Sequence, residues 1–401
     1  MSHHDAIVLG AGAAGLYAAI FAGRRGRRVL VLDHAEKAGK KILISGGGRC
    51  NFTNVNTDSR RFLSRNPHFA ISALKRHTPA DFVALVDRHG IRWHEKKLGQ
   101  LFCDESARDI VAMLLAECAD AGVAIRLDCR IDHVARVHAG DAAAFAVDTS
   151  HGPFTAGSLI VATGGLSIPK MGATGLAYDI ARRFSLPIVE PRPALVPFTF
   201  AAGDLERTKD LSGIALDGTV SCGGTAFREA LLITHRGLSG PSILQISSYW
   251  REGEAVTIDL SPDQPLLDRF KALKRERPKA ELRTILAELL PRRFGERLAE
   301  WALPELGVTS RPMAQMPDRE LSSLSAFLHA WTIRPDGTEG YRTAEVTLGG
   351  VDTDALSSKT MEAKAVPGLF FVGEAVDVTG WLGGYNFQWA WSSGFAAGQA
   401  V

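Results

Sequence analysis

The chain has 401 residues, of which 46% are hydrophobic and 22% are charged, and these values are typical of a soluble globular protein with a large core. At about 150 residues per domain the length predicts two or three domains, and the net charge of +2 favours neither nucleic acid nor a membrane as the main partner. The five cysteines include no CxxC pair, so we expect no metal site, no redox disulfide and a cytoplasmic, reducing location.

An uncharged run near the N-terminus, "AIVLGAGAAGLYAAIFAG" at residues 6–23, is about as long as a minimal membrane span of ~18 residues. It also resembles the apolar core of a signal peptide. However, no Lys or Arg precedes the run and the basic cluster "RRGRR" follows it, which is the reverse of a signal sequence. The run therefore predicts a folded segment, and we expect no membrane partner.

The same run has the order of elements that dinucleotide-binding proteins use. We predict a strand over 6–9, a helix over 16–22 and a second strand over 28–33 that ends on Asp33. The turn between the first strand and the helix reads Gly-x-Gly-x-x-Gly. A strand before this motif and a helix after it make the motif specific.

Each glycine of the turn is expected to have its own role. Gly10 allows the tight turn, Gly12 lets the backbone approach a pyrophosphate, and Gly15 lets the helix pack closely on the strand. The helix N-terminus offers N–H groups and a partial positive charge to the phosphates. Asp33 is expected to accept hydrogen bonds from the ribose hydroxyls. This segment therefore predicts a bound dinucleotide.

The stretch "KKILISGGGRCNFTN" at residues 40–54 contains three consecutive glycines, Gly46, Gly47 and Gly48. Because glycine has no Cβ, such a run lets bare backbone approach a ligand closely. No Gly-Lys-Ser/Thr ends the run, so it is not a phosphate loop of the P-loop type. We predict a loop that follows the dinucleotide.

The remaining segments divide into helical, β-rich and helical stretches in chain order. Helices are predicted over 67–88 and 102–122, and a β-rich region over 190–256 precedes a helical region over 262–328. Between the predicted helices and the β-rich region, a meander of short strands leads into a buried strand. The meander strands are predicted over 131–137, 143–149 and 154–156, and the buried strand over 158–165. This meander is typical of two-dinucleotide-fold flavoproteins, whereas a simple dehydrogenase would continue with further βα units.

The C-terminal segment favours a flavin over a nicotinamide. In "GLFFVGEAVDV" a buried strand ends at Gly373, and the acids Glu374 and Asp377 follow where flavoproteins bring a carboxylate beside the ribityl chain. A helix that begins near Asn386 would direct its N–H groups at the pyrimidine edge of the flavin. The residues Gly383, Gly384, Tyr385 and Gln388 crowd into the same short stretch.

Four segments, "KKILISGGGRCNFTN", "ITHRGLSGPSIL", "TAEVTLGGV" and "GGYNFQWAWSSGFAAG", resemble the bacterial FAD-dependent oxidoreductases that include aminoacetone oxidase and BaiN-type flavoproteins. The resemblance runs over nearly the whole chain. It implies an α/β, Rossmann-like FAD-binding fold of the two-dinucleotide-binding flavoprotein type, with inserted β-barrel-like and helical domains. The expected domains are an FAD-binding domain (1–190 plus 343–401), a β-rich inserted domain (191–260 plus 329–342) and a helical inserted domain (261–328).

Two departures from the family are visible. Leu176 and Ala177 stand where members tend to have a polar pair, and Asp33 stands where Glu is commoner. The FAD-binding residues predicted from the motifs and the resemblance are Gly10, Ala11, Gly12, Ala13, Ala14, Gly15, Asp33, His34, Lys40, Lys41, Ser45, Gly46, Gly47, Gly48, Asn51, Asn54, Ile131, Thr163, Gly164, Gly165, Gly373, Glu374, Asp377, Gly383, Gly384, Tyr385, Asn386 and Gln388.

Catalytic candidates are chosen by their charge or by their place beside the glycine-rich segments: Arg49, Lys41 and Tyr385. The leading hypothesis is an FAD-dependent oxidoreductase that transfers a hydride equivalent between a small amine, ketone or alkene-type substrate, or NAD(P)H, and the flavin, with oxygen or another acceptor completing the cycle. No second strand–GxGxxG–helix unit is visible, so NAD(P)H would visit only transiently.

Two alternatives remain open. One is a flavin-dependent RNA-modifying or RNA-bound flavoprotein that uses the basic helical region, although the ordinary charge balance makes nucleic acid the less favoured partner. The other is an NAD-binding dehydrogenase without flavin. The substrate, the acid–base residue and the oligomeric state are not predicted by the sequence.

Overall fold

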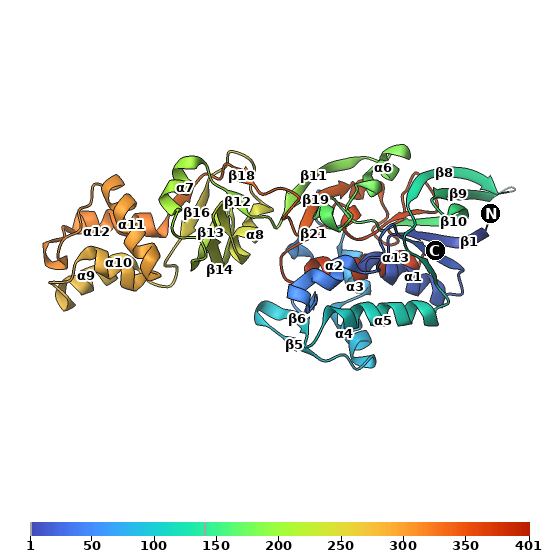
Figure 1. Cartoon of the computed structure of the whole chain (residues 1–401), viewed down its shortest axis with the longest axis horizontal. Helices are drawn as coiled ribbons and strands as arrows, with labels where there is room; N and C mark the ends of the chain where they lie inside the picture. The colour runs from blue at the N-terminus through green and yellow to red at the C-terminus, as the bar shows by residue number, and fades with distance from the viewer. Residues whose placement is uncertain (1, 140–141) are drawn as a thin grey trace. The chain divides into compact units, whose positions relative to one another are not determined.

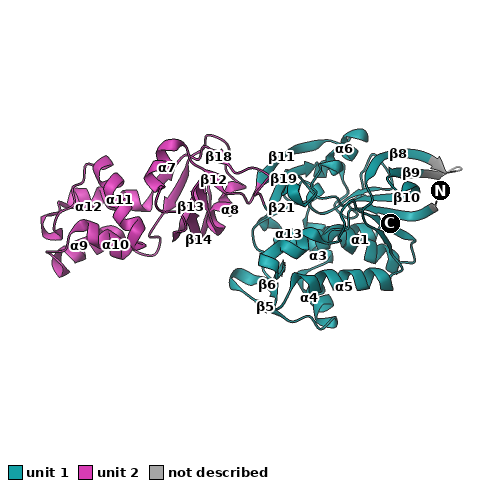
Figure 2. Cartoon of the chain, viewed as in Figure 1, with its two compact units in different colours: residues 1–193, 345–401 teal, residues 194–344 magenta. Residues whose placement is uncertain are grey.

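The computed structural model describes residues 2–139 and 142–401, and the chain forms two compact units (Figure 2). The first unit combines both ends of the chain, residues 1–193 and 345–401, and the second comprises residues 194–344. The expected three-part division stays a prediction. In the described ranges no helix is both long enough and apolar enough to cross a membrane.

The first unit is built on a sheet with the order β7-β2-β1-β10-β9-β8, in which β20 also pairs with β10. β1 pairs in parallel with β2 and β10, and β10 pairs in parallel with β20, whereas β8, β9 and the start of β10 form the antiparallel meander. The strands are β1 Ser2–Leu9, β2 Val29–Leu32, β7 Ala124–Arg126, β8 Ile131–Ala139, β9 Ala142–Thr149, β10 Gly152–Val161 and β20 Leu369–Phe371.

The parallel register brings the ends of three strands together, because Leu9 pairs with both Leu32 and Val161. These strands are buried on both faces, which accounts for their continuous apolar sequence. The carboxyl ends of parallel strands are where ligands bind in open α/β sheets. The glycine-rich turn, Asp33 and Thr163 all follow these strand ends.

Helices cover this sheet, and the first and last of them pack side by side (Figure 1). A Cβ placed on Gly394 would lie 2.6 Å from the carbonyl oxygen of Ala14, and one on Gly398 would lie 2.5 Å from that of Ala18. The C-terminal glycines therefore allow the close contact that joins the two ends of the chain. The helices of this unit are α1 Ala13–Arg24, α2 Lys40–Ile44, α3 Ile71–Arg76, α4 Pro79–Arg88, α5 Ala107–Asp120, α6 Leu176–Arg183 and α13 Tyr385–Gly398.

Three small sheets complete the first unit, with the orders β3-β6-β5, β21-β4 and β11-β19. They connect segments that are far apart in sequence. Their strands are β3 Asn51–Asn54, β4 Phe62–Leu63, β5 Trp93–Glu95, β6 Gln100–Cys103, β11 Ile188–Ala194, β19 Val346–Val351 and β21 Thr379–Gly380.

The second unit has an antiparallel sheet with the order β17-β16-β13-β14-β15-β12-β18, and a group of helices lies in sequence between β16 and β17. Its strands are β12 Phe198–Thr199, β13 Ala215–Cys222, β14 Thr225–Ile233, β15 Gly237–Ser239, β16 Val256–Asp259, β17 Trp331–Ile333 and β18 Gly337–Thr338. Its helices are α7 Ala202–Thr208, α8 Pro241–Ser247, α9 Leu266–Glu276, α10 Leu282–Leu289, α11 Arg292–Glu305 and α12 Asp318–His329.

Some predicted elements were wrong in their bounds. The segment 40–54 is not one loop, because it contains α2, a 3₁₀ turn over Ser45–Gly48 and strand β3. The helix predicted over 102–122 begins only at Ala107, where the Ser106 side chain caps it. The helix predicted over 67–88 is two helices, since Thr78 starts a new one with a capping box.

The two last strands of the meander were also wrong as separate elements. They form the single strand β10, which pairs with β9 through its first half and with β20 through its second half. The early strand–helix–strand prediction is confirmed by β1, α1 and β2.

Candidate active site

The glycine-rich turn packs against protein at two glycines and is open at the third. A Cβ on Gly10, whose φ is +107°, would lie 2.5 Å from the carbonyl oxygen of Ala162, and one on Gly15 would collide with the carbonyl oxygen of Gly10. Around Gly12 no protein atom lies within 4 Å of the Cβ position. Gly12 is also the N-cap residue of α1, and no side chain caps this helix. The turn thus presents the unpaired N–H groups of a helix N-terminus to open space.

The Asp33 carboxylate lies beside this turn. It accepts hydrogen bonds from the backbone N–H groups of Ala11 at 2.6 Å and Ala35 at 2.8 Å, and its side chain is 15% exposed. A carboxylate has about four lone-pair sites, so it can accept further hydrogen bonds. His34 lies next to it, and its Nδ1 is 3.6 Å from the Asp33 carboxylate. The Asp33 carboxylate, with His34 beside it, can therefore accept hydrogen bonds from the hydroxyls of a ribose.

The end of β10 supplies an unsatisfied hydroxyl. Thr163 Oγ1 is buried and has no hydrogen-bond partner in the described part of the chain. Gly164 follows with a φ of +75° and open space at its Cβ position. A Cβ on Gly165 would instead collide with the Thr347 side chain. A buried hydroxyl without a partner is costly in a native structure, and this one lies at the edge where a ligand would satisfy it.

Lys41, Ser167 and Glu374 form a polar cluster at the same edge. Lys41 Nζ lies 2.9 Å from Glu374 Oε2 and donates to Ser167 Oγ at 2.6 Å, while Ser167 Oγ donates to Glu374 Oε1 at 2.8 Å. The backbone N–H of Thr347 donates to Glu374 as well, at 3.0 Å. Although burial opposes ionisation, Lys41 and these donors hold the pKa of Glu374 below its usual value. The cluster joins three segments that the sequence separates widely.

The run of three glycines forms a sharp turn, with φ values of +57°, +67° and +86° for Gly46, Gly47 and Gly48. Only glycine adopts three such conformations in succession without strain. No protein atom lies within 4 Å of the Cβ positions of Gly47 and Gly48. Arg49 follows the turn; it is exposed and makes no ion pair with any described residue. The turn therefore offers bare backbone and one uncompensated cation.

Several predicted contact residues hold the protein together instead of facing open space. Asn54 Nδ2 donates to the carbonyl oxygen of Gly383 at 2.8 Å, and the Asn51 amide contacts the Gln100 amide at 3.1 Å. Gly384 lies against strand β3. The Asn54 amide thus attaches the loop before α13 to the small sheet, and the Asn51 amide joins β3 to β6 within that sheet.

The amides on α13 have similar roles. Asn386 Oδ1 accepts from the N–H of Gly380 at 2.8 Å, and the amide of Gln388 is fully buried and donates to the carbonyl oxygen of His77. Tyr385 is buried, with its ring 6.1 Å from that of Phe62. These residues hold the segment at the start of α13 in place through contacts within the protein.

The other predicted residues surround the strand ends or lie close to them. Burial raises the pKa of Asp377, which accepts from the backbone N–H of Arg65 at 2.8 Å. Gly373 donates its N–H to Ser393 Oγ. Lys40 begins α2. The start of this helix lies beside the glycine-rich turn, because the N–H of Gly39 donates to the backbone carbonyl oxygen of Ala11. Ile131 begins β8, just after Cys129, whose N–H donates to the backbone carbonyl oxygen of Asp33.

The sequence did not single out four residues near this site: Ser167, Thr347, Arg61 and Trp381. A polar residue after a strand end is too common a signal to find Ser167. A fifth residue, Glu345, precedes β19 and is two positions from Thr347, on the same face of an extended chain. The Glu345 side chain is exposed by its surface area, although desolvation raises the pKa of its carboxyl. No sequence motif marks it beyond its place in "TAEVTLGGV".

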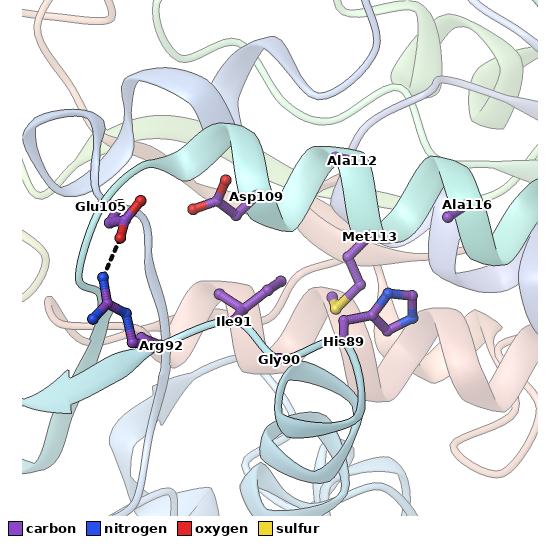
Figure 3. Close-up of a pocket in the computed structure, with 9 residues that line it drawn as sticks. All are labelled: His89, Gly90, Ile91, Arg92, Glu105, Asp109, Ala112, Met113 and Ala116. Atoms are coloured by element: carbon purple, nitrogen blue, oxygen red, sulfur yellow. Dashed lines mark hydrogen bonds and ion pairs between the residues drawn. The ribbon is translucent and has the colours of Figure 1, made fainter.

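A surface pocket lies elsewhere in the first unit (Figure 3). Its volume is about 470 Å³, and Arg92 and Glu105 form an ion pair at one end while His89 and Met113 line the other. The pocket contains none of the predicted FAD-binding residues. It lies between α5 and the segment 89–92 that follows α4, and we assign the chemistry to the strand ends instead.

The residues at the strand ends fit FAD. The open helix N-terminus at Gly12 suits a pyrophosphate, and Asp33 suits the adenosine ribose. The hydroxyl of Thr163 has no partner among the described residues, and the backbone of Gly47 and Gly48 carries no side chain and has open space beside it, so both suit the approach of a flat ring. No group of His, Cys, Asp and Glu side chains suited to a metal ion occurs among the described residues.

Comparison with known proteins agrees with this fit. The family model for the HI0933-like protein Rossmann domain matches residues 4–400. The chain is 50% identical to the ribosomal RNA dihydrouridine synthase of Escherichia coli and 47% identical to that of Haemophilus influenzae, in each case over 100% of this chain and 98% of the relative. It is 28% identical to the 3-dehydro-bile acid delta(4,6)-reductase of Clostridium scindens, over 98% of both chains.

The chain therefore belongs to the HI0933-like family, which is a family of FAD-binding oxidoreductases. The predicted family and the Rossmann-like fold class are confirmed, and the protein is an FAD-dependent oxidoreductase.

Proposed function

We propose that this protein reduces a uridine of ribosomal RNA to dihydrouridine. The observation that carries the proposal is full-length identity of 50% and 47% to two proteins named ribosomal RNA dihydrouridine synthase. Of the alternatives that the sequence left open, this one is the flavin-dependent RNA-modifying enzyme. It takes precedence over the small-molecule oxidoreductase because the more distant relative, at 28%, is the one that acts on a small molecule.

The proposed chemistry is the reduction of a carbon–carbon double bond conjugated to a carbonyl. In uracil, a hydride goes to C6 and a proton to C5, beside the C4 carbonyl. The balanced reaction is uridine plus NAD(P)H plus H⁺, giving dihydrouridine and NAD(P)⁺. A bile-acid reductase that removes a conjugated double bond uses the same chemistry, so the two activities fit one family. Reduced FAD, when bound, supplies the hydride.

The residues of this chain would bind and orient the reactants. The turn around Gly12 and the N-terminus of α1 hold the pyrophosphate, and Asp33 holds the ribose. Lys41 pairs with Glu374 and would hold the Glu374 carboxylate beside the ligand. Arg49 is an exposed cation without an ion pair to any described residue, so its proposed role is to stabilise negative charge that develops on the uracil carbonyl.

The proton at C5 needs an acid, and we assign it to Glu345. The Glu345 side chain is exposed, desolvation raises the pKa of its carboxyl, and it lies two residues from Thr347, whose backbone N–H donates to Glu374. A Glu345→Gln variant should slow reduction of the RNA while NAD(P)H still reduces the flavin at the wild-type rate. Equal losses in both half-reactions would contradict this role.

The function is tested by mass spectrometry of ribosomal RNA. RNA from cells that lack the gene is incubated with the purified holoprotein and NADH or NADPH, and dihydrouridine is counted before and after. We expect one site to become fully modified, and the same site to be unmodified in the deletion strain. A deletion strain with unchanged dihydrouridine, together with inactive purified enzyme, would contradict the proposal.

Arg49 offers a sharper test within the same assay. Arg49→Ala should lower kcat/KM for RNA by about 10- to 100-fold, since charge stabilisation in the transition state contributes a few kcal/mol. Arg49→Lys should retain part of the activity. Arg130→Ala is the matched control, because Arg130 is equally exposed but pairs with Asp132 on the meander. If Arg49→Ala keeps full turnover, the glycine turn does not lie at the reacting ring.

A second candidate is reduction of a small α,β-unsaturated ketone, which the bile-acid reductase relative favours. The two candidates are separated by comparing kcat/KM for deproteinised ribosomal RNA and for a conjugated steroid ketone under the same donor. A higher value for the ketone would favour this candidate.

A further inference from the structure

The Arg61 side chain is a half-buried cation without an anion. Its guanidinium carbon lies 5.2 Å from the ring centroid of Trp381 and 5.6 Å from that of Tyr385. Within residues 2–139 and 142–401 it makes no ion pair and no side-chain hydrogen bond. Its neighbours differ, because Arg60 pairs with Asp58 and Arg65 pairs with Asp352. A guanidinium has five N–H donors, so Arg61 retains its full capacity to bind an acceptor.

The backbone around Trp381 is held in place. The N–H of Trp381 donates to the carbonyl oxygen of Arg61 at 3.0 Å, and Asn386 Nδ2 donates to the carbonyl oxygen of Gly380 at 2.9 Å. The same amide also reaches the carbonyl oxygen of Trp381 at 3.3 Å. The strands β4 and β21 pair directly beside these residues, with Phe62 opposite Gly380. The cation and the indole are therefore preorganised, and a ligand would meet a rigid surface.

This surface borders the proposed flavin site along the chain. Trp381 lies in the loop between Glu374, which pairs with Lys41, and Tyr385, which begins α13. Gly383 and Gly384, in the same loop, rest on the side chain of Gln100 and on strand β3, into which the three-glycine turn leads. A group held at Trp381 would lie next to the segment that carries the predicted ring contacts.

The chemistry of the pair matches one nucleotide of single-stranded RNA. The half-buried indole of Trp381 offers a surface on which a base can stack, and its cation–π pair with Arg61 strengthens such stacking. The free donors of the guanidinium suit a phosphate or a base carbonyl, and RNA recognition commonly combines both contacts. An acidic peptide would use the cation but not the aromatic ring.

We propose that Arg61 and Trp381 form a binding platform for an unpaired nucleotide of the RNA substrate, adjacent to the uridine that is reduced. The proposal rests on the proposed function for the identity of the RNA. The base stacks on the indole while Arg61 donates to the phosphate. No covalent step occurs at this platform; it fixes the strand so that the target base reaches the flavin site.

The test measures binding of the FAD-loaded protein to a fluorescent single-stranded oligouridylate at several salt concentrations. Trp381→Ala should raise Kd by about 5- to 100-fold, because stacking on an aromatic ring contributes that much per base. Trp381→Phe should lose less. Arg61→Ala should reduce the slope of log K against log salt by about 1, as expected for one lost phosphate contact, whereas Arg61→Lys should keep the slope and weaken binding.

Arg130→Ala is again the charge control and should change neither quantity. The FAD content and Tm of each variant are measured, and if Trp381→Ala loses FAD, the conservative Trp381→Phe and Arg61→Lys variants decide the question. The platform proposal would be contradicted if all four variants kept the wild-type Kd, the wild-type salt slope and the wild-type kcat/KM on ribosomal RNA.

The outcome separates the platform from the proposed function. If the wild-type protein makes dihydrouridine and the variants equal it, the platform alone fails. If the wild-type protein makes none but binds the oligouridylate through Trp381, the platform stands and the proposed function fails.

Discussion

On α13, the buried amide of Gln388 has partners inside the protein, whereas part of the edge at the ends of β1 and β10 is open. Gln388 accepts from Thr53 at 2.5 Å and donates to the carbonyl oxygen of His77 and to Ser392, each at 3.0 Å. At the strand ends, Thr163 Oγ1 has no described partner and Gly12 faces open space.

This difference distinguishes residues that stabilise the fold from residues that are available to bind a ligand. A closed hydrogen-bond network stabilises the fold and gains nothing from a ligand, whereas an open donor edge is satisfied only when a ligand is present. Substitutions in the two regions should therefore have opposite effects: loss of stability in the first and loss of FAD in the second.

The largest expected effect is at the glycine turn. Gly12→Val adds a side chain where the structure has open space, so it should weaken FAD binding by at least about 100-fold while the apoprotein loses only about 1 kcal/mol from the changed N-cap. Gly15→Ala is the matched variant, and it should destabilise the apoprotein strongly because its Cβ meets the carbonyl oxygen of Gly10. Flavin titration and Tm distinguish the two; a Gly12→Val protein with wild-type FAD affinity would contradict the site.

In this network, Gln388→Leu should lower the free energy of unfolding by about 1–3 kcal/mol, since it leaves the buried Thr53 hydroxyl without its acceptor, while Ser392 Oγ still donates to the carbonyl oxygen of His77. Its effect on FAD affinity should be smaller than its effect on stability. Gln399→Leu, at the end of the same helix, is the control and should cost less than about 0.5 kcal/mol. Denaturant unfolding measures both, and equal losses would show that the network is not closed.

The same network predicts a pH dependence. His77 is buried and bonded to the Tyr17 hydroxyl at 2.8 Å, and burial lowers its pKa from 6.5 to about 4. Below pH 6.5 the unfolded chain takes up a proton that the folded state refuses until about pH 4, so stability is lost as pH falls through this window, by about 3 kcal/mol. His77→Gln should lack this component. Unfolding curves with the same pH slope for both proteins would contradict it.

The smallest expected effect is at Thr163. Thr163→Val removes the partnerless hydroxyl, so FAD affinity should fall about 5-fold, the value of one hydrogen bond, while the apoprotein keeps or gains stability. Thr155→Val, within β10, is the control. A stability loss without a change in FAD affinity would place a protein partner on Thr163.

The local pattern of the chain was enough to predict β1, α1, β2 and Asp33, because strand, turn and helix are adjacent in sequence. It was not enough for contacts between distant segments. Lys41 and Glu374 are 333 positions apart, and only the folded sheet brings them together. The start of α5 was misplaced for the same reason: residues 100–103 pair with β3 and β5, and this non-local pairing overrides the helical pattern.

The segment 40–54 failed for a different reason. Its short apolar run fits a loop, a strand or one helical turn equally well, and the five residues of α2 are too few to show a period. The three glycines form a turn with positive φ, and its close approach to a ligand stays a prediction, but the sequence could not say that they precede a strand.

The central claim is that one flavin site in this protein reduces uridine in RNA. The most direct measurement is an anaerobic single turnover: the holoprotein is reduced stoichiometrically, the excess donor is removed, and ribosomal RNA from cells lacking the gene is added. We predict that the flavin absorbance returns and that one dihydrouridine forms per flavin reoxidised. Flavin that stays reduced in the presence of this RNA, but is reoxidised by a conjugated ketone, would contradict the account.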